Sequence, residues 1–87
     1  MSVEKTTQAI ELLLRSMIQL PEGTARDQNL MEYGLDAIYT IRLVAELEEI
    51  FNIMFNDNEL RFENFNTIKN IVQNVIRRVS NSVLETN

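Results

Sequence analysis

Side chains able to act as nucleophiles or general bases are scarce in this sequence. The chain of 87 residues contains no histidine and no cysteine, and its only lysines are Lys5 and Lys69. A serine hydroxyl therefore lacks an imidazole that could activate it, and both lysines fall on polar faces of predicted helices. We expect a protein that is not an enzyme and has no catalytic residues.

Carboxylates are plentiful, but their spacing does not favour acid–base or metal chemistry. Glu48 and Glu49 are neighbours on a predicted helix and point in different directions, so we interpret them as part of a solvated face. The segment over residues 56–63 lacks the central glycine and the late glutamate of a calcium loop. Because zinc-binding Cys and His are also missing, we predict no metal site.

Residue 37 is the one position whose surroundings suggest a chemical role. The run Gly34-Leu35-Asp36-Ala37-Ile38 places residue 37 directly after an aspartate that is a good helix N-cap. The free amides and the positive dipole end of a helix N-terminus favour a phosphate group, so a hydroxyl at residue 37 would be well placed to carry a phosphodiester. The alanine methyl has no oxygen for such a bond.

Helical periodicity predicts the elements that must position this site. A first helix is expected over residues 3–19, ended by Pro21. Its apolar residues recur with helical spacing at Ile10, Leu13, Leu14, Met17 and Ile18. Residues 24–33 should form one long surface loop, pinned to the core in its middle by Leu30 and Met31.

The second helix should begin after the Asp36 cap and end near Phe51, where Asn52 follows. Beyond it, residues 56–59 should cap a single helical turn over residues 60–62. The second helix therefore presents residue 37 in its first turn.

A third long helix is expected from Ile68, because the apolar residues that follow keep helical rather than alternating spacing. Asn66 or Thr67 could cap it, and Arg77 and Arg78 would suit its negative dipole end. Its apolar positions are Ile68, Ile71, Val72, Val75, Ile76 and Val79.

These elements predict an all-α fold, a compact four-helix bundle of three main helices and one short helix with a long first loop. We expect a single domain over residues 1–87, with its core over about residues 3–80 and a frayed C-terminal tail. No signal-peptide pattern and no membrane-length apolar run occur, so we expect a soluble monomer with no membrane partner. Without cysteine, the default compartment is cytoplasmic.

The second helix carries two apolar faces. The expected core stripe comprises Leu43, Val44, Leu47, Ile50 and Phe51. On the opposite side, Ile38, Ile41 and Ala45 form a smaller patch. Its charged neighbours are Arg42, Glu46, Glu48 and Glu49. Either loop residues such as Leu30, Met31 or Tyr33 cover this patch, or it is a docking surface for a transient partner.

Charge is distributed unevenly along the chain. The net charge is −5, whereas residues 27–63 hold nine acidic residues against two arginines, a net of −7. An acidic middle disfavours binding to nucleic acid and favours a partner with a basic surface. A purely solubilising surface is the alternative.

The motif and its surroundings resemble the phosphopantetheine-dependent carrier proteins of fatty acid, polyketide and nonribosomal peptide synthesis. Their attachment motif is close to Gly-Leu-Asp-Ser-Leu or Gly-Leu-Asp-Ser-Ile, and residues 34–38 differ from the second only by Ala for Ser. The similarity continues without gaps from residues 29–33 through residues 43–51 to residues 63–68. The lead-in over residues 29–38 is most similar to aryl and peptidyl carrier domains, which implies a stand-alone carrier.

This resemblance implies a cofactor and a set of partners. In the family, a transferase moves 4'-phosphopantetheine from coenzyme A to the serine hydroxyl, and the thiol of the arm then holds acyl, aryl or aminoacyl thioesters. The implied partners are a phosphopantetheinyl transferase, adenylation or other acyl-loading enzymes, condensation or ketosynthase enzymes, and a thioesterase. Because family partners grip the start of the second helix, the resemblance makes Ile38, Ile41 and Ala45 docking residues.

Ala37 departs from the family pattern, because it removes the only oxygen to which the arm could be attached. Thr40, one turn further on, is no substitute, since it lies inside the helix and is rotated away from the terminus. Two explanations stay open: a Ser-to-Ala change in a working carrier, which the high helix propensity of alanine would tolerate, and a natural arm-less module that only docks. The intact motif around residue 37 favours the first.

Overall fold

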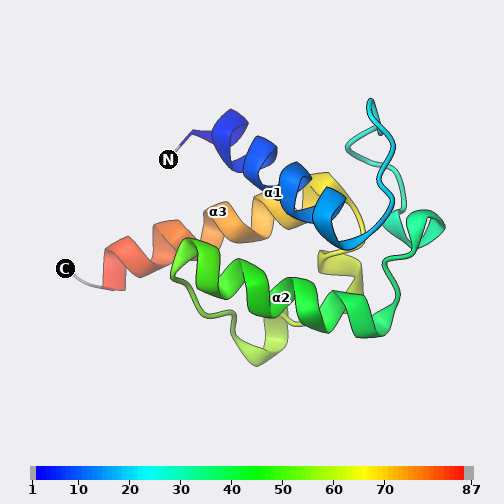
Figure 1. Ribbon diagram of the computed structural model, residues 1–87. Coiled ribbons are helices and arrows are strands. Elements are labelled where there is room, and N and C mark those ends of the chain that lie inside the picture. Colours follow the sequence, from blue (N-terminus) through cyan, green and yellow to red (C-terminus); the bar gives the residue numbers. More distant parts are fainter. Residues whose placement is uncertain (1, 86–87) are drawn as a thin grey trace.

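The computed structural model describes the backbone of residues 2–85 and the side chains of residues 2–80. Three α-helices, α1 (Val3–Met17), α2 (Ala37–Phe51) and α3 (Ile68–Glu85), are joined by segments that contain short 3-10 turns. α3 packs against both other helices and passes behind them in Figure 1. No strand occurs in the described residues, which confirms the predicted all-helical fold with three main helices.

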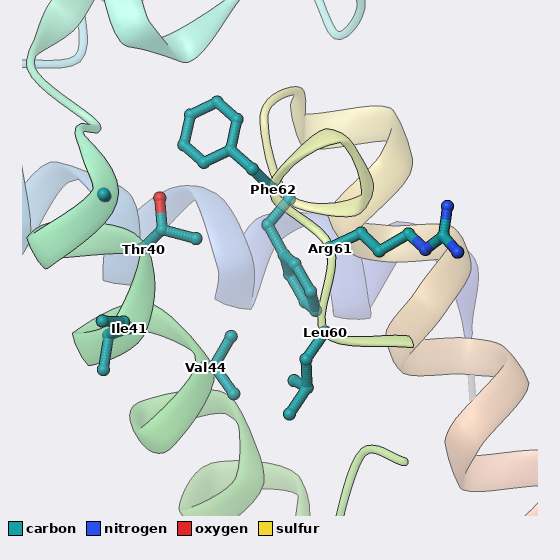
Figure 2. A pocket seen from close by; sticks show the side chains of 8 residues that line it. Thr40, Ile41, Val44, Leu60, Arg61 and Phe62 are labelled. Carbon is teal, nitrogen blue, oxygen red and sulfur yellow. The ribbon is translucent and has the colours of Figure 1, made fainter. Parts of the chain in front are cut away.

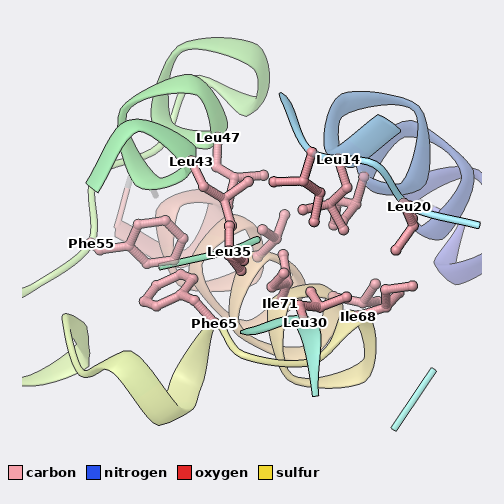
Figure 3. Close-up of a cluster of buried hydrophobic side chains, with 14 of the residues drawn as sticks. Leu14, Leu20, Leu30, Leu35, Leu43, Leu47, Phe55, Phe65, Ile68 and Ile71 are labelled. Carbon is pink, nitrogen blue, oxygen red and sulfur yellow. The ribbon is translucent and has the colours of Figure 1, made fainter. Parts of the chain in front are cut away.

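The core lies where α1, α2 and the first loop meet α3. Leu14 of α1, Leu47 of α2 and Ile71 of α3 are completely buried, together with Leu30 and Leu35 from the loop. Figure 3 shows these side chains converging from the three helices and the loop. The apolar spacing that predicted the helices therefore also identifies the side chains that hold them together.

Side-chain caps set the ends of the helices. At the start of α2, Asp36 Oδ1 accepts a hydrogen bond from Tyr39 N at 2.9 Å, and Asn52 ends that helix in a left-handed conformation with φ of 53°. Thr67 Oγ1 accepts from Asn70 N at 3.1 Å. Of the two caps predicted for α3, Thr67 therefore fills the role.

The long first loop is pinned to the segment that precedes α3. Leu30 N donates to Asn66 O at 2.8 Å, and the Leu30 side chain is completely buried. The loop contains a 3-10 turn, η1 (Leu30–Tyr33), that the sequence did not predict. Met31, expected to help pin the loop, is 53% exposed, so the prediction for this residue was wrong.

The core stripe predicted on α2 is wider than the face that the other elements cover. Leu43 and Leu47, in its middle, are completely buried, and Val44 and Phe51 at one edge are half-buried. Ile50 lies at the other edge and is 52% exposed, so its assignment to the core was wrong. Periodicity gives the rotation of a helix but does not give the width of the surface that its neighbours bury.

The short fourth helix was also predicted incorrectly. Instead of one turn over residues 60–62, the structure has two 3-10 turns: η2 (Asp57–Glu59) ends before these residues, and η3 (Phe62–Asn64) begins at the last of them. The first turn begins directly after Asn56, where the Glu59 carboxylate folds back and accepts from Asn56 N at 2.7 Å, as in a capping box.

α3 is longer than expected. It continues to Glu85, past the predicted core limit at residue 80, so Arg78 is not in its last turn. Arg78 is 5% exposed and its Nη1 lies 3.4 Å from Glu59 Oε1, so this side chain pairs with η2 instead of the helix dipole. Residues 86 and 87, the end of the predicted frayed tail, lie outside the described residues.

The difference in burial between Leu47 and Ile50 predicts different costs for the same truncation. Leu47→Ala should lower the free energy of unfolding by about 2–5 kcal/mol, because it leaves a cavity in the core. Ile50→Ala, on the same helix, should cost under about 1 kcal/mol. Urea unfolding followed by circular dichroism measures both, and equal losses would contradict the placement of Ile50.

Candidate functional site

The residues before position 37 each fix the start of α2. Gly34 N donates to Leu30 O and Met31 O and closes η1 with φ of 102°, a left-handed conformation that favours glycine. Leu35 is completely buried and anchors the chain directly before the helix. The cap from Asp36 then starts the helix at a defined residue.

Ala37 is the first residue of α2 and is exposed. The amides of a first helical turn and the positive end of the dipole suit a phosphate at this place, but the alanine methyl offers no oxygen to bond to it. Thr40 does not replace that oxygen. Thr40 is only 7% exposed, and its hydroxyl donates a hydrogen bond to Asp36 O at 2.7 Å within the helix.

A groove of about 310 Å³ begins beside residue 37. It is lined by Ala37, Thr40, Ile41 and Val44 of α2 and by Leu60, Arg61, Phe62 and Phe65 from beyond it. Figure 2 shows the two walls facing each other, with the Arg61 side chain directed away from α2. Because Ala37 lines this groove, a substituent on residue 37 would lie next to it.

Sequence reasoning did not find this groove. Residues 60–65 come at least 23 residues after Ala37, and only the turn of the chain after α2 brings them opposite it. The sequence did contain one signal for this wall: Leu60 and Phe62 are apolar residues within a polar stretch. In the structure neither of them is buried in the core.

The second apolar face of α2 is uncovered. Ile38 and Ile41 are 77% and 73% exposed, and Ala45 is exposed as well. At these exposures the preceding loop does not shield the patch. Three charged residues border it: Arg42 and Glu49, both exposed, and Glu46, half-buried.

Glu48, expected to border the same patch, is directed elsewhere. Its Oε2 accepts a hydrogen bond from Phe55 N at 3.0 Å, and the Phe55 side chain is buried in the core. Glu48 therefore holds the segment that leaves α2 against the helix, and we do not include it among the residues free to contact a partner.

Comparison with known proteins identifies the family. The family model described as the phosphopantetheine attachment site matches residues 8–75, a range that contains α2 and the groove. The chain belongs to this carrier family. A D-alanyl carrier protein of Streptococcus pyogenes serotype M5 (strain Manfredo) is 37% identical over 76 residues, which are 86% of this chain and 92% of that relative. The D-alanyl carrier protein of serotype M1 matches equally well.

Carriers of this family are not enzymes, and they hold their cargo on a 4'-phosphopantetheine arm. The exposed helix start and the groove beside it fit such an arm, but the side chain of Ala37 does not fit its attachment. The chain as it stands therefore has no atom at residue 37 that could hold the arm.

The part of the chain that the structure describes shows neither a metal site nor a membrane span. No group of three or more His, Cys, Asp or Glu residues there could hold a metal ion. Among these residues, no helix combines the length and apolar character needed to cross a bilayer.

The placement of Glu48 predicts a contrast with its neighbour. Glu48→Ala should lower the free energy of unfolding by about 1–3 kcal/mol, because the Phe55 amide loses its acceptor. Glu49→Ala removes an exposed carboxylate one residue on and should change it by less than about 0.5 kcal/mol. Urea unfolding compares the two, and an equal response would show that Glu48 does not hold this segment.

Proposed function

We propose that this chain is an acyl or peptidyl carrier protein in which alanine replaces the attachment serine, so that it folds and docks but cannot be loaded. The observation that carries this proposal is the position of Ala37, exposed and first in α2 directly after the Asp36 cap. Because residue 37 is exposed and lines the groove, a serine here would present its hydroxyl to solvent beside the groove. Only the oxygen is missing.

The surroundings of residue 37 support a replaced serine over a natural arm-less protein. Gly34 closes η1, Leu35 anchors the chain and Asp36 caps the helix, so the local structure that an arm would need is complete. Ile38 directly after it is 77% exposed and open to a partner.

We propose an aryl or aminoacyl cargo, held in a pathway of the nonribosomal peptide type, over the fatty acid and polyketide alternatives. Two observations support this choice. The lead-in over residues 29–38 is most similar to aryl and peptidyl carriers. The relatives are named D-alanyl carrier protein, and a D-alanyl group is an aminoacyl group, so this second observation supports the cargo, while the first supports the pathway.

The proposed docking surface is the exposed face of α2 with Ile38, Ile41 and Ala45 at its centre. A small apolar centre bordered by Arg42, Glu46 and Glu49 suits a transient partner, because the apolar contacts supply affinity and the charges orient the encounter. The acidic excess over residues 27–63 favours basic surfaces on the transferase and on the loading, condensing and thioesterase enzymes.

The decisive experiment restores the missing oxygen. Ala37→Ser should gain one phosphopantetheine when it is incubated with coenzyme A and a broad-specificity phosphopantetheinyl transferase, whereas the unchanged chain should gain none. Intact mass spectrometry measures the difference. If folded Ala37→Ser gains no arm, the chain is not a carrier with a replaced serine, and the second candidate, a natural arm-less interaction module that uses the same face of α2, takes its place.

The docking surface has its own test in the Ala37→Ser background. Ile41→Glu should lower the kcat/KM of the transferase by about tenfold or more, because it places a charge in the apolar centre of the contact. Leu12→Glu is the control, since Leu12 is 65% exposed but lies on α1.

Thermal unfolding should show both variants to be folded, with melting temperatures close to that of the parent. If Ile41→Glu loaded as fast as the Leu12 control, docking through this face would be ruled out. A large drop in melting temperature would show instead that Ile41 belongs to the core.

A further inference from the structure

We call residues 56–64 the flap. They contribute Leu60, Arg61 and Phe62 to the groove wall opposite α2, and none of their side chains is buried in the core. On either side of the flap, Phe55 and Phe65 are 4% and 1% exposed, and their rings meet edge to face with centroids 5.3 Å apart. Between these two rings no residue is buried. The flap therefore has fixed ends that lie close together and a middle that apolar packing does not hold.

Polar side chains on one face of α3 hold the flap instead. They are spaced four residues apart, at Asn70, Asn74 and Arg78. Asn70 Nδ2 donates to Glu63 O at 2.9 Å and Asn74 Nδ2 donates to Asn64 O at 3.1 Å. Arg78 Nη1 lies 3.4 Å from Glu59 Oε1. Each residue of this row contacts a different residue of the flap.

Glu59 connects this row to the internal bonds of the flap. Its Oε1 also accepts from Asn56 N at 2.7 Å, and its carbonyl oxygen accepts from Asn64 Nδ2 at 2.8 Å. The side chains of Arg78 and Glu59 are only 6% and 12% exposed. Because water screens both charged groups only weakly, their attraction is stronger than that of an exposed pair and favours the closed flap.

We propose that Glu59, Asn70, Asn74 and Arg78 form a latch, and that the flap opens as one unit when the latch releases. Water can replace the polar contacts of the flap, whereas Phe55 and Phe65 keep their burial, so opening costs less than unfolding the core. Leu60 and Phe62 move with the flap, and the groove beside residue 37 widens. This opening is a property of the fold and does not depend on the proposed carrier function.

The test compares two identical substitutions in the flap of the full chain. Glu59→Gln removes the latch charge, and Glu63→Gln removes a charge whose side chain is 67% exposed. Methyl relaxation-dispersion NMR should report an open state at Leu60 and Val44 whose population rises about tenfold in Glu59→Gln and stays unchanged in Glu63→Gln. The buried methyl groups of Leu14 should show no such exchange in either variant.

Two results would overturn the latch. The first is an equal open population in the two glutamine variants, and the second is exchange at Leu14 with the same rate and population as at Leu60, which would be unfolding of the whole domain. If Glu59→Gln does not fold, Asn70→Ala replaces it with exposed Lys69→Ala as its control. The same contrast at Leu60 is then required, and its absence also refutes the latch.

Discussion

The hydrogen bond from Tyr39 N to the Asp36 carboxylate, together with the buried Leu35 directly before it, decides where α2 begins. An α-helix turns by about 100° per residue, so once the cap and the buried Leu47 hold α2 in place, the side on which every other residue of the helix lies is also set. The cap makes residue 37 the first of the helix, and the packing of Leu47 leaves Ile41 facing solvent. The position of residue 37, the groove wall on α2 and the proposed docking face therefore depend on the cap and the core together.

The features that could be predicted from the sequence are those that depend on neighbours along the chain. Helical spacing identified the three helices, and side-chain chemistry identified Asp36 as a cap, because both are local. The predictions that Ile50 lies in the core and that Glu48 borders the exposed patch were wrong because they depend on contacts between distant parts of the chain. Their surroundings depend on how far α3 covers α2 and on where the chain turns after α2, and neither is encoded in the period of the helix.

The latch illustrates the same limit. Asn70, Asn74 and Arg78 show their spacing of four in the sequence, but polar residues beside an apolar stripe ordinarily mark the edge of a solvated face. Their partners lie in the flap, which was expected to be a single turn. Only the path of the flap across α3 reveals that Asn74 and Arg78 are 5% exposed and bonded to it. Residue 37 and the exposed face of α2 could therefore be proposed as a site from the sequence, whereas the opposite wall of the groove could not.

Attachment and docking make separate physical demands on α2. Attachment needs one oxygen at residue 37, whereas the proposed docking face needs several side chains held in a fixed rotation by the cap and the core. Ala37 is exposed at a helix start, where alanine and serine differ by only a few tenths of a kcal/mol, and the contacts described above do not use a hydroxyl at this residue. Losing that oxygen therefore leaves the helix, the groove and the exposed face in place. A partner that binds the exposed face of α2 would contact the same surface whether residue 37 is alanine or serine. Only the transfer of the arm would distinguish the two forms.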